Sequence, residues 1–211
     1  MKIQRTLTLA AVALLLAACK QETAPSVATT AQRAPVSPEE AQLATERGKA
    51  IVAQAFGVLS SNLLTALKQG GPTNALPFCS AEAQSLTESL AAAGGVELRR
   101  VSHRARNPKN EADAAEFAIL QQFDKTIRNQ QKPLPVVATS AKGQVAFYAP
   151  IAITNAVCLN CHGQPTVEVQ PDTLALIRQR YPNDQATGFK LGDLRGLWVI
   201  EFRRDAFPTG K

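Results

Sequence analysis

Residues 135–148 read PVVATSAKGQVAFY, in which two runs rich in valine and aromatic residues flank the polar turn Ser140-Ala141-Lys142-Gly143. Such runs on either side of a short turn with glycine predict a β-hairpin, and therefore antiparallel strands. Further strands are expected at residues 96–105 and 197–202. Helical segments surround these strands without a regular alternation, which indicates an α+β fold with a central antiparallel sheet and flanking helices.

A long N-terminal helix is expected from Pro38 to the break at Gly70-Gly71-Pro72. Ser37 can cap this helix, Pro38 suits its first position, and Glu40 completes a capping box. Because the helix is long for a small domain, we also consider a homodimer paired through it. Its apolar residues recur at helical spacing: Leu43, Ile51, Ala55, Val58, Leu59, Leu63 and Leu67.

Three shorter helices are expected further along the chain, each with its own start and stop signals. The first runs from Ser80 to Gly94, the second from Asn110 to about Lys125, and the third from Pro171 to Arg180. Residues 73–79, before the first of them, are expected to form a turn or a short helical piece.

The first 18 residues have the features of a secretory signal peptide. Lys2 and Arg5 precede an uncharged run rich in leucine and alanine, residues 6–18. A membrane-spanning helix needs roughly 20 apolar residues, so this shorter run fits a signal peptide over residues 1–18. The run ends Leu16-Ala17-Ala18-Cys19, which resembles a bacterial lipoprotein signal and implies lipid on Cys19.

Residues 19–37 are rich in Ala, Thr, Ser and Pro and contain almost no large apolar side chain. Such a segment cannot bury enough surface to order itself, so we expect a flexible, lipidated tether before a single domain of residues 38–211. The expected location is the periplasm, with the lipid anchored in a membrane. Lys20 is not the aspartate that often retains lipoproteins at the inner membrane, which favours the outer membrane.

The composition is that of an ordinary globular protein, since 45% of the 211 residues are hydrophobic and 19% are charged. The formal net charge of +6 is modest. Binding of nucleic acid needs basic residues clustered on one face, so we expect no nucleic-acid partner. The sequence also lacks a catalytic constellation, and we do not expect an enzyme.

The motif Cys158-Leu159-Asn160-Cys161-His162 carries the clearest chemical signal. Two thiols three positions apart can form thioethers with the two vinyl groups of one haem, and the histidine that follows then ligates the iron as the proximal ligand. One covalent haem c is therefore the expected cofactor. Haem attachment of this kind takes place outside the cytoplasm, in agreement with the independent signal-peptide feature.

Other uses of this motif fit less well. A thioredoxin-like redox pair needs a βαβ context, and none precedes Cys158. A structural zinc site needs four well-spaced ligands, whereas Cys161 and His162 are adjacent. A disulfide between Cys158 and Cys161 leaves His162 unexplained.

The residues available in the mature chain limit which side chains could be the second axial ligand of the haem iron. Met1 is the only methionine and is lost with the signal peptide, which excludes a His/Met pair. Cys79, His103, a lysine, a tyrosine or an open position remain, and the chemistry favours Cys79 and His103 about equally. The arginines from Arg99 to Arg106 have two explanations: a solvated strand edge, or one or two partners of the haem propionates.

Several short segments of the sequence occur together in a known family. They are Arg100-Val101-Ser102, Arg106-Asn107-Pro108 with Asn110, Phe147-Tyr148-Ala149-Pro150, Cys158-Leu159-Asn160-Cys161-His162-Gly163, and Tyr181-Pro182-Asn183-Asp184-Gln185-Ala186-Thr187-Gly188-Phe189 followed by Gly192-Asp193-Leu194-Arg195-Gly196. Together they resemble the single-haem c-type domain with a PAS-like fold, found alone or as an extracytoplasmic sensor module of signalling proteins. The resemblance covers roughly residues 40–204.

This resemblance implies an axial cysteine from the helical region ahead of the Arg-Val-Ser strand, and the matching residue is Cys79. It leads us to expect a haem protein that senses redox state or a small ligand, with electron transfer between periplasmic partners as the alternative. A redox or signalling protein would be its partner. Phe189 and Trp198 stand where the family pattern has a tyrosine and a smaller polar residue.

Overall fold

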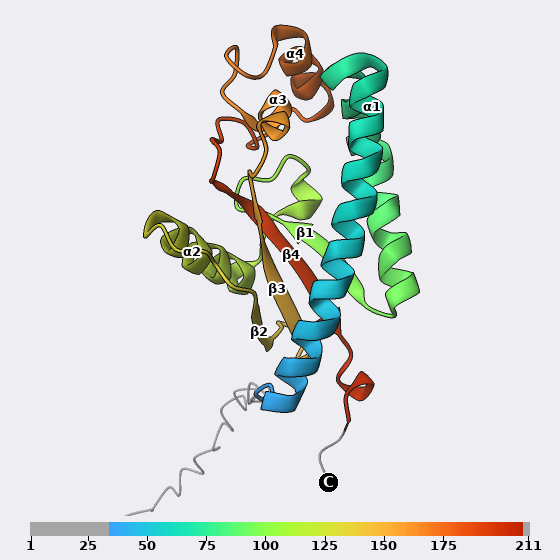
Figure 1. Ribbon diagram of the computed structural model, residues 1–211, viewed down its shortest axis with the longest axis vertical. Helices are drawn as coiled ribbons and strands as arrows, with labels where there is room; N and C mark the ends of the chain where they lie inside the picture. The colour runs from blue at the N-terminus through green and yellow to red at the C-terminus, as the bar shows by residue number, and fades with distance from the viewer. Residues whose placement is uncertain (1–33, 209–211) are drawn as a thin grey trace, which may run out of the picture. The chain divides into compact units, whose positions relative to one another are not determined.

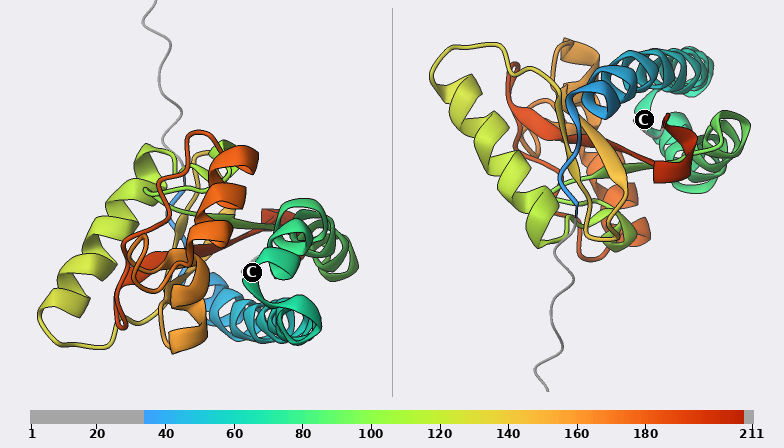
Figure 2. Two further views of the ribbon diagram at one scale, coloured as in Figure 1. Left: turned by 90° about the horizontal axis from the view of Figure 1, so that it is seen from above. Right: turned by 90° about the horizontal axis from the view of Figure 1, so that it is seen from below.

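The computed structural model describes residues 34–208, without the side chains of residues 80–83. The predicted signal peptide, Cys19 and most of the predicted tether lie outside the described residues. Helix α1 (Pro38–Gly94) covers one face of a four-stranded antiparallel sheet and α2 (Ala114–Arg128) covers the other (Figures 1 and 2). The predicted α+β fold with a long N-terminal helix is confirmed. In sheet order, the strands are β1 (Glu97–Val101), β4 (Leu194–Phe202), β3 (Val145–Ala152) and β2 (Val136–Thr139).

The hairpin of residues 135–148 forms as predicted, from β2 and β3. The Ser140 side chain accepts hydrogen bonds from two backbone N–H groups of the turn, and Gly143 has a positive φ of 78°. Glycine adopts that conformation without a steric penalty, which explains its place in the turn. β3 is longer than predicted and continues past Tyr148 to Ala152, because it pairs with β4 over this length.

The side chains of the two central strands alternate between two apolar layers. Phe147 and Ile200 belong to the layer beneath α1, where they pack with Leu59. Val199 belongs to the opposite layer and packs with Leu120 of α2. Because both faces of the sheet are covered, β3 and β4 are apolar at nearly every position instead of at every second one.

Helix α1 begins as predicted, with a complete capping box between Ser37 and Glu40. Gly70 and Gly71 interrupt it with non-helical backbone angles, so two helical segments meet at the predicted break. Gly71 has a φ of 68°, which side chains other than hydrogen disfavour.

The second segment of α1 runs from Pro72 to the predicted stop, where Gly95 takes a left-handed φ of 62°. Residues 73–79 are helical throughout. The separate helix start predicted at Ser80 is therefore wrong. Pro72 restarts the helix directly after the break, because a proline suits the first turn of a helix.

The first segment of α1 exposes apolar side chains, since Phe56 is 58% exposed and Leu64 is 45% exposed. By length and composition only, Pro38–Cys79 is apolar enough to cross a membrane. Ala55 and Leu59 of this helix are nevertheless buried against the sheet, as in a helix of a folded domain. The homodimer through this helix stays a prediction.

Helix α2 starts later than predicted, with Asp113 as its cap. The Asp113 carboxylate accepts from the Glu116 N–H and the Glu116 carboxylate accepts from the Asp113 N–H. Asn110, the predicted cap, instead ends the short 3-10 helix Pro108–Asn110. That prediction was wrong because the Asp113–Glu116 pair forms a complete capping box, which a single asparagine cannot offer.

Among the remaining elements, α4 (Pro171–Arg180) has its predicted bounds. β1 ends at Val101, earlier than predicted, because the Ser102 N–H donates to the backbone of Asn110 and the chain leaves the sheet. β4 begins at Leu194, three residues before its predicted start.

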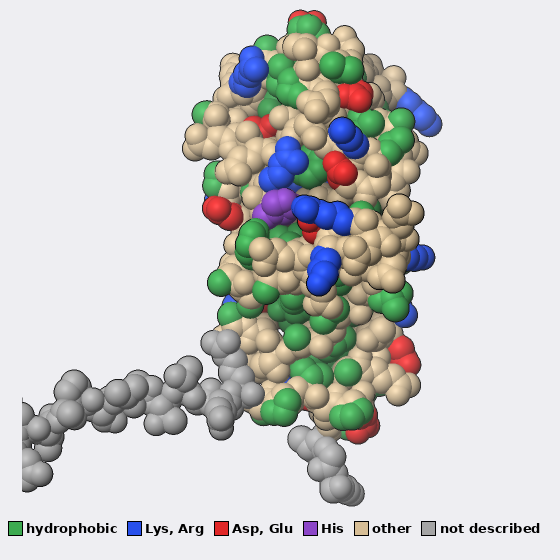
Figure 3. Space-filling view, turned by 90° about the vertical axis from the view of Figure 1, so that its left-hand side faces the viewer, with side chains coloured by type: hydrophobic (Ala, Val, Ile, Leu, Met, Phe, Trp, Pro, Cys, Tyr) green, Lys and Arg blue, Asp and Glu red, His purple; other side chains and the backbone are tan. Residues whose placement is uncertain are grey.

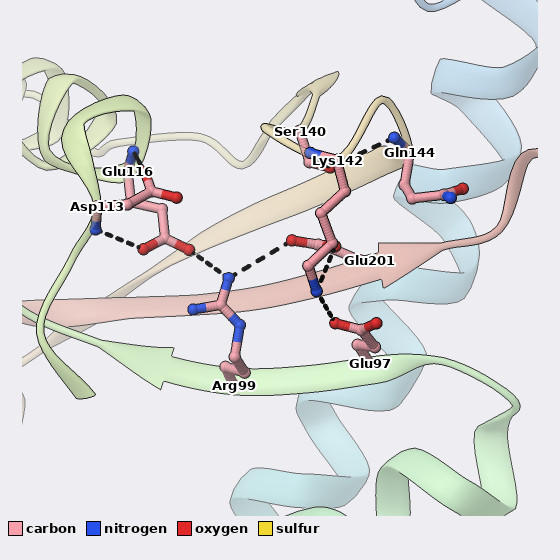
Figure 4. Close-up of polar contacts among 8 residues, drawn as sticks. All are labelled: Glu97, Arg99, Asp113, Glu116, Ser140, Lys142, Gln144 and Glu201. Atoms are coloured by element: carbon pink, nitrogen blue, oxygen red, sulfur yellow. Dashed lines mark hydrogen bonds and ion pairs between the residues drawn. The ribbon is translucent and has the colours of Figure 1, made fainter. Parts of the chain in front are cut away.

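An ion-pair network joins α2 to β1 and β4 (Figure 4). Arg99 Nη2 lies 2.6 Å from Glu116 Oε1 and 3.4 Å from Glu201 Oε1, and both carboxylates are buried. Lys142 from the hairpin turn contacts the other Glu201 oxygen at 3.4 Å and also pairs with Glu97. Since a buried carboxylate is costly without a cation, this network fixes the helix and the hairpin turn against the sheet edge.

Two glycines of α1 provide a matched test of how closely this helix lies on the sheet. A Cβ atom on Gly48 would lie 2.4 Å from the Phe147 ring, whereas a Cβ on Gly57 would have nothing within 4 Å. We expect Gly48→Ala to lower the free energy of unfolding by about 1–3 kcal/mol through overpacking. Gly57→Ala should raise it by about 0.5–1 kcal/mol through helix propensity. Chemical denaturation measures both, and stabilisation by both variants would contradict the packing described here.

Candidate haem-binding site

The predicted haem motif lies beyond the end of the sheet, in a short helical segment (Figure 1). The 3-10 helix Ala156–Cys158 leads directly into α3 (Leu159–His162). The Asn155 side chain caps this segment by accepting from the Val157 N–H at 2.9 Å. Residues three apart lie on the same side of a helical turn, so Cys158 and Cys161 are presented together, both as free thiols.

His162 is held in one orientation by a backbone carbonyl. Its Nδ1 lies 2.7 Å from the carbonyl oxygen of Ala186. Burial, and then the charges of Arg195 and Arg106, lower the pKa of His162 well below its usual value, so the imidazole is neutral at pH 7. A neutral imidazole whose Nδ1–H is bonded to a carbonyl leaves Nε2 as the ligand atom, which is the usual state of a metal-bound histidine.

The segment that carries Ala186 is held in turn by Arg106 and Asp184. Arg106 Nε lies 3.0 Å from Asp184 Oδ1, and Arg106 Nη2 donates to the Cys161 carbonyl at 2.6 Å. Asp184 Oδ1 also accepts from the Ala186 N–H at 3.0 Å. The sequence did not identify Asp184 and Ala186 as site residues, although both belong to the Tyr181–Phe189 segment that carries the family resemblance.

Cys79 is anchored near the motif through the second segment of α1. Leu76, one helical turn before Cys79, is buried and packs against Val169, Leu174 and Ile177. Val169 lies in the connection between α3 and α4, and the other two belong to α4. The helix that carries Cys79 therefore contacts the chain that follows the haem motif.

The Cys79 thiol lies within electrostatic range of the motif. Burial raises the pKa of Cys161 to about 11, and the charge of Cys79 contributes to that rise. Burial also raises the pKa of Cys79, whereas the charges of Arg100 and Arg106 lower it. The side chain is nevertheless exposed to solvent. The structure thus brings Cys79 and Cys161 into one region, with both thiols protonated at neutral pH.

His103, the other candidate for the second axial position, is directed toward α2. Its ring packs edge-on against Phe117, with 6.4 Å between the ring centroids. Burial and the charge of Arg104 lower the pKa of His103. His103 thus contacts α2, whereas Cys79 belongs to the second segment of α1.

The donor set fits a c-type haem better than a bare metal ion. Among the described residues, no three His, Cys, Asp or Glu side chains come together in a way that could hold a metal ion. A structural zinc site usually needs four such ligands. Cys158, Cys161 and His162 instead provide two thiols for thioether bonds and one neutral imidazole, which is what a covalent haem requires.

The arginines between Arg99 and Arg106 do not form a solvated strand edge. Lys and Arg side chains do gather around a histidine on the face shown in Figure 3. However, Arg99 lies between two buried carboxylates, and the Arg106 side chain is only 11% exposed and pairs with Asp184. Arg104 donates to the backbone carbonyls of Gln185 and Thr187. That interpretation was wrong because Arg99 pairs with carboxylates of α2 and β4, while Arg104 and Arg106 bind the segment beside α3.

The comparisons with known proteins agree with this geometry. Residues 15–203 match the family model described as Tll0287-like. The chain belongs to the Tll0287-like family. The crystal structure of the cyanobacterial heme-protein Tll0287 matches with a TM-score of 0.53 and 27% sequence identity, covering 75% of this chain and 95% of that one. The comparison with curated proteins gave no match. The family indicated by the sequence motifs is therefore confirmed.

Phe189 and Trp198, the two residues of this Tll0287-like chain that depart from the expected pattern, are each contacted by an arginine side chain. Phe189 is buried, and its ring lies edge-on to the His162 ring at 6.2 Å and 90°. The guanidinium carbon of Arg104 lies 4.1 Å from the centre of the Phe189 ring, and that of Arg100 lies 5.8 Å from the Trp198 ring. The Phe189 ring thus holds the Arg104 cation near His162 by a cation–π contact.

Proposed function

We propose that this chain binds one haem c covalently and uses it in the periplasm to sense redox state or a small ligand. The observation that carries the proposal is the contact of His162 Nδ1 with the Ala186 carbonyl, together with the free thiols of Cys158 and Cys161 in the same short helical segment. The match to a heme-protein of the same family supports it. No enzyme activity forms part of the proposal.

In this proposal each residue of the site has a defined task. Cys158 and Cys161 hold the haem through thioethers, and His162 is the proximal ligand through Nε2. Bound haem supplies a one-electron iron couple. Ala186 keeps the imidazole in one tautomer through its carbonyl, and the Phe189 ring packs perpendicular to the imidazole ring.

Haem attachment is tested by mass after denaturation. The protein, produced in cells that attach haem, should exceed the mass of its processed polypeptide by one haem in acid and organic solvent, because thioethers survive both. The double variant Cys158→Ala/Cys161→Ala should lose this mass. Cys79→Ala is the control and should keep it, because Cys79 is assigned to the iron and not to the haem vinyl groups. Haem that extracts freely from the wild type would contradict the proposal.

Cys79 is the ligand that we assign to the iron opposite His162. It lies within electrostatic range of Cys161, on a helix anchored by Leu76 to the chain that follows the motif. The competing candidate, His103, packs against Phe117 of α2. A thiolate donates negative charge to the iron and stabilises its ferric form, so the reduction potential should be low.

Replacing this ligand should therefore change the potential strongly. We expect Cys79→Ala to alter the ferric spectrum and to raise the reduction potential by roughly 0.1–0.3 V, within the range over which axial ligands act. His103→Ala is the matched control and should leave both unchanged. Spectroelectrochemical titration measures both variants. The reverse result, with His103→Ala altering the spectrum and Cys79→Ala leaving it intact, would mean bis-histidine ligation.

The assignment of Cys79 favours sensing over electron transfer. With haem bound, reduction would weaken the bond of a Cys79 thiolate to the iron, and the position opposite His162 would then be available to a small ligand. An electron carrier instead needs the same ligands in both oxidation states. Rapid binding of carbon monoxide to the ferrous protein supports sensing. A clean reversible couple without carbon monoxide binding supports the alternative, electron transfer between periplasmic partners.

For location, we infer a lipid on Cys19 that anchors the protein in a periplasmic membrane, with the outer membrane favoured. The Leu16-Ala17-Ala18-Cys19 signal supports this inference. The wild type should be recovered in the membrane fraction, and Cys19→Ser should release or misprocess it. Replacing a nearby residue of the tether, as in Ser26→Ala, should have no effect. A wild-type protein found only in the soluble periplasmic fraction would contradict the lipid anchor.

A further inference from the structure

Four arginines converge beside the haem motif with one carboxylate among them. Among the described residues, the charges that act on Arg195 are those of Arg106, Asp184, Arg100 and Arg104. Asp184 pairs with Arg106 at 3.0 Å. Four guanidinium groups and one carboxylate leave an excess of three positive charges in this region.

Arg195, at the start of β4, has an incompletely satisfied guanidinium group. Its Nη1 donates to the Arg104 carbonyl oxygen at 3.2 Å, and its Nε is buried without a hydrogen-bond partner. Burial, followed by the charge of Arg106, lowers the pKa of Arg195 to about 9. A buried cation with an unpaired N–H group is costly, and folded proteins normally supply an anion to such a group.

Arg195 is linked to His162 of the haem motif through the ring of Phe189. Its guanidinium carbon lies 5.4 Å from the centre of the Phe189 ring, and Arg104 approaches the same ring at 4.1 Å. Phe189 in turn contacts the His162 ring. The two cations are therefore separated from the proximal histidine by a single aromatic ring, so an anion that binds them lies beside the haem.

We propose that Arg195, with Arg104 beside it, forms a carboxylate-binding site on β4 and that a propionate of the bound haem occupies it. The inference rests on the proposed attachment of haem to α3. A guanidinium group can bind both oxygens of a carboxylate, and the two propionates of one haem would offset two of the three excess charges. A carboxylate from solution has the same chemistry, but a covalently held haem presents its propionates at a far higher effective concentration.

The test uses the haem-loaded protein, and its first readout is the propionate bending band in the resonance Raman spectrum. In Arg195→Gln this band should shift, because the propionate loses a charged donor. The ferrous-to-ferric ratio at a fixed ambient potential should also fall roughly tenfold, since removing a nearby cation disfavours the more negative, reduced haem. Arg195→Lys retains the charge without the planar fork, so it should shift the band while keeping the ratio near that of the wild type.

Arg204→Gln is the matched control for the loss of a partly buried arginine. Arg204 donates to the backbone carbonyls of Gly143 and Ala34, beyond the opposite end of β4. This variant should leave both the Raman band and the ferrous-to-ferric ratio unchanged, even where it lowers stability. A shift of the same size in Arg204→Gln would show that the effect of Arg195→Gln is a general loss of stability and would overturn the assignment.

Titration of the loaded wild type with acetate at constant ionic strength separates the two sources of carboxylate. We expect no saturable change in the potential, because the propionate fills the site. A saturable response that Arg195→Lys weakens would mean that a carboxylate from solution is bound instead. An unshifted band in both Arg195 variants, with haem still attached by mass, would overturn the propionate site while leaving haem attachment intact. If Arg195→Gln fails to fold, Arg195→Lys and the acetate titration still test whether a propionate occupies the site.

Discussion

The carbonyl oxygen of Ala186 accepts hydrogen bonds from two side chains that come from distant parts of the chain. His162 Nδ1 lies 2.7 Å from it and Arg106 Nη2 lies 3.3 Å from it. Asp184 completes the arrangement, because its Oδ1 accepts from the Ala186 N–H and also pairs with Arg106. The hydrogen bond on the second ring nitrogen of a metal-binding histidine fixes the tautomer and the orientation of the ring. The proposed haem site therefore depends on the 184–189 segment staying against α3.

The sheet provides the fixed frame on which this segment rests. A Cβ atom on Gly196 would lie 2.4 Å from the Val101 carbonyl oxygen, so β1 and β4 approach each other more closely here than a side chain would permit. The Ser102 hydroxyl donates to the Arg195 carbonyl at 2.8 Å and thereby joins the end of β1 to the start of β4. The chain leaving β1 then carries Arg104 and Arg106 to the 184–189 segment. The pairing of β1 with β4 thus sets the positions of Arg104 and Arg106 near His162.

Features that depend on residues close together in the sequence could be predicted, whereas contacts between distant residues could not. The Cys158–His162 motif and the bounds of α4 depend on residues a few positions apart, so spacing and end signals were enough to find them. Asp184 and Arg106 are 78 positions apart in the sequence, so their ion pair could not be predicted without knowing the fold. The prediction failed at Asn110, because Asp113 forms a reciprocal capping box with Glu116 and Asn110 instead ends the preceding 3-10 helix.

The charges of the site explain why the proposed ligand and the arginines act on the iron in opposite directions. A Cys79 thiolate donates electrons to iron and favours the ferric form, whereas buried guanidinium groups favour the form with the extra electron. Two propionates would offset two of the three excess positive charges, and the thiolate would offset the third. With haem bound, reduction of the iron would weaken its attraction for a Cys79 thiolate, whereas the charges of Arg100 and Arg106 would still act on that thiolate. These two arginines would therefore stabilise the negative charge of Cys79 if it dissociated from the reduced iron.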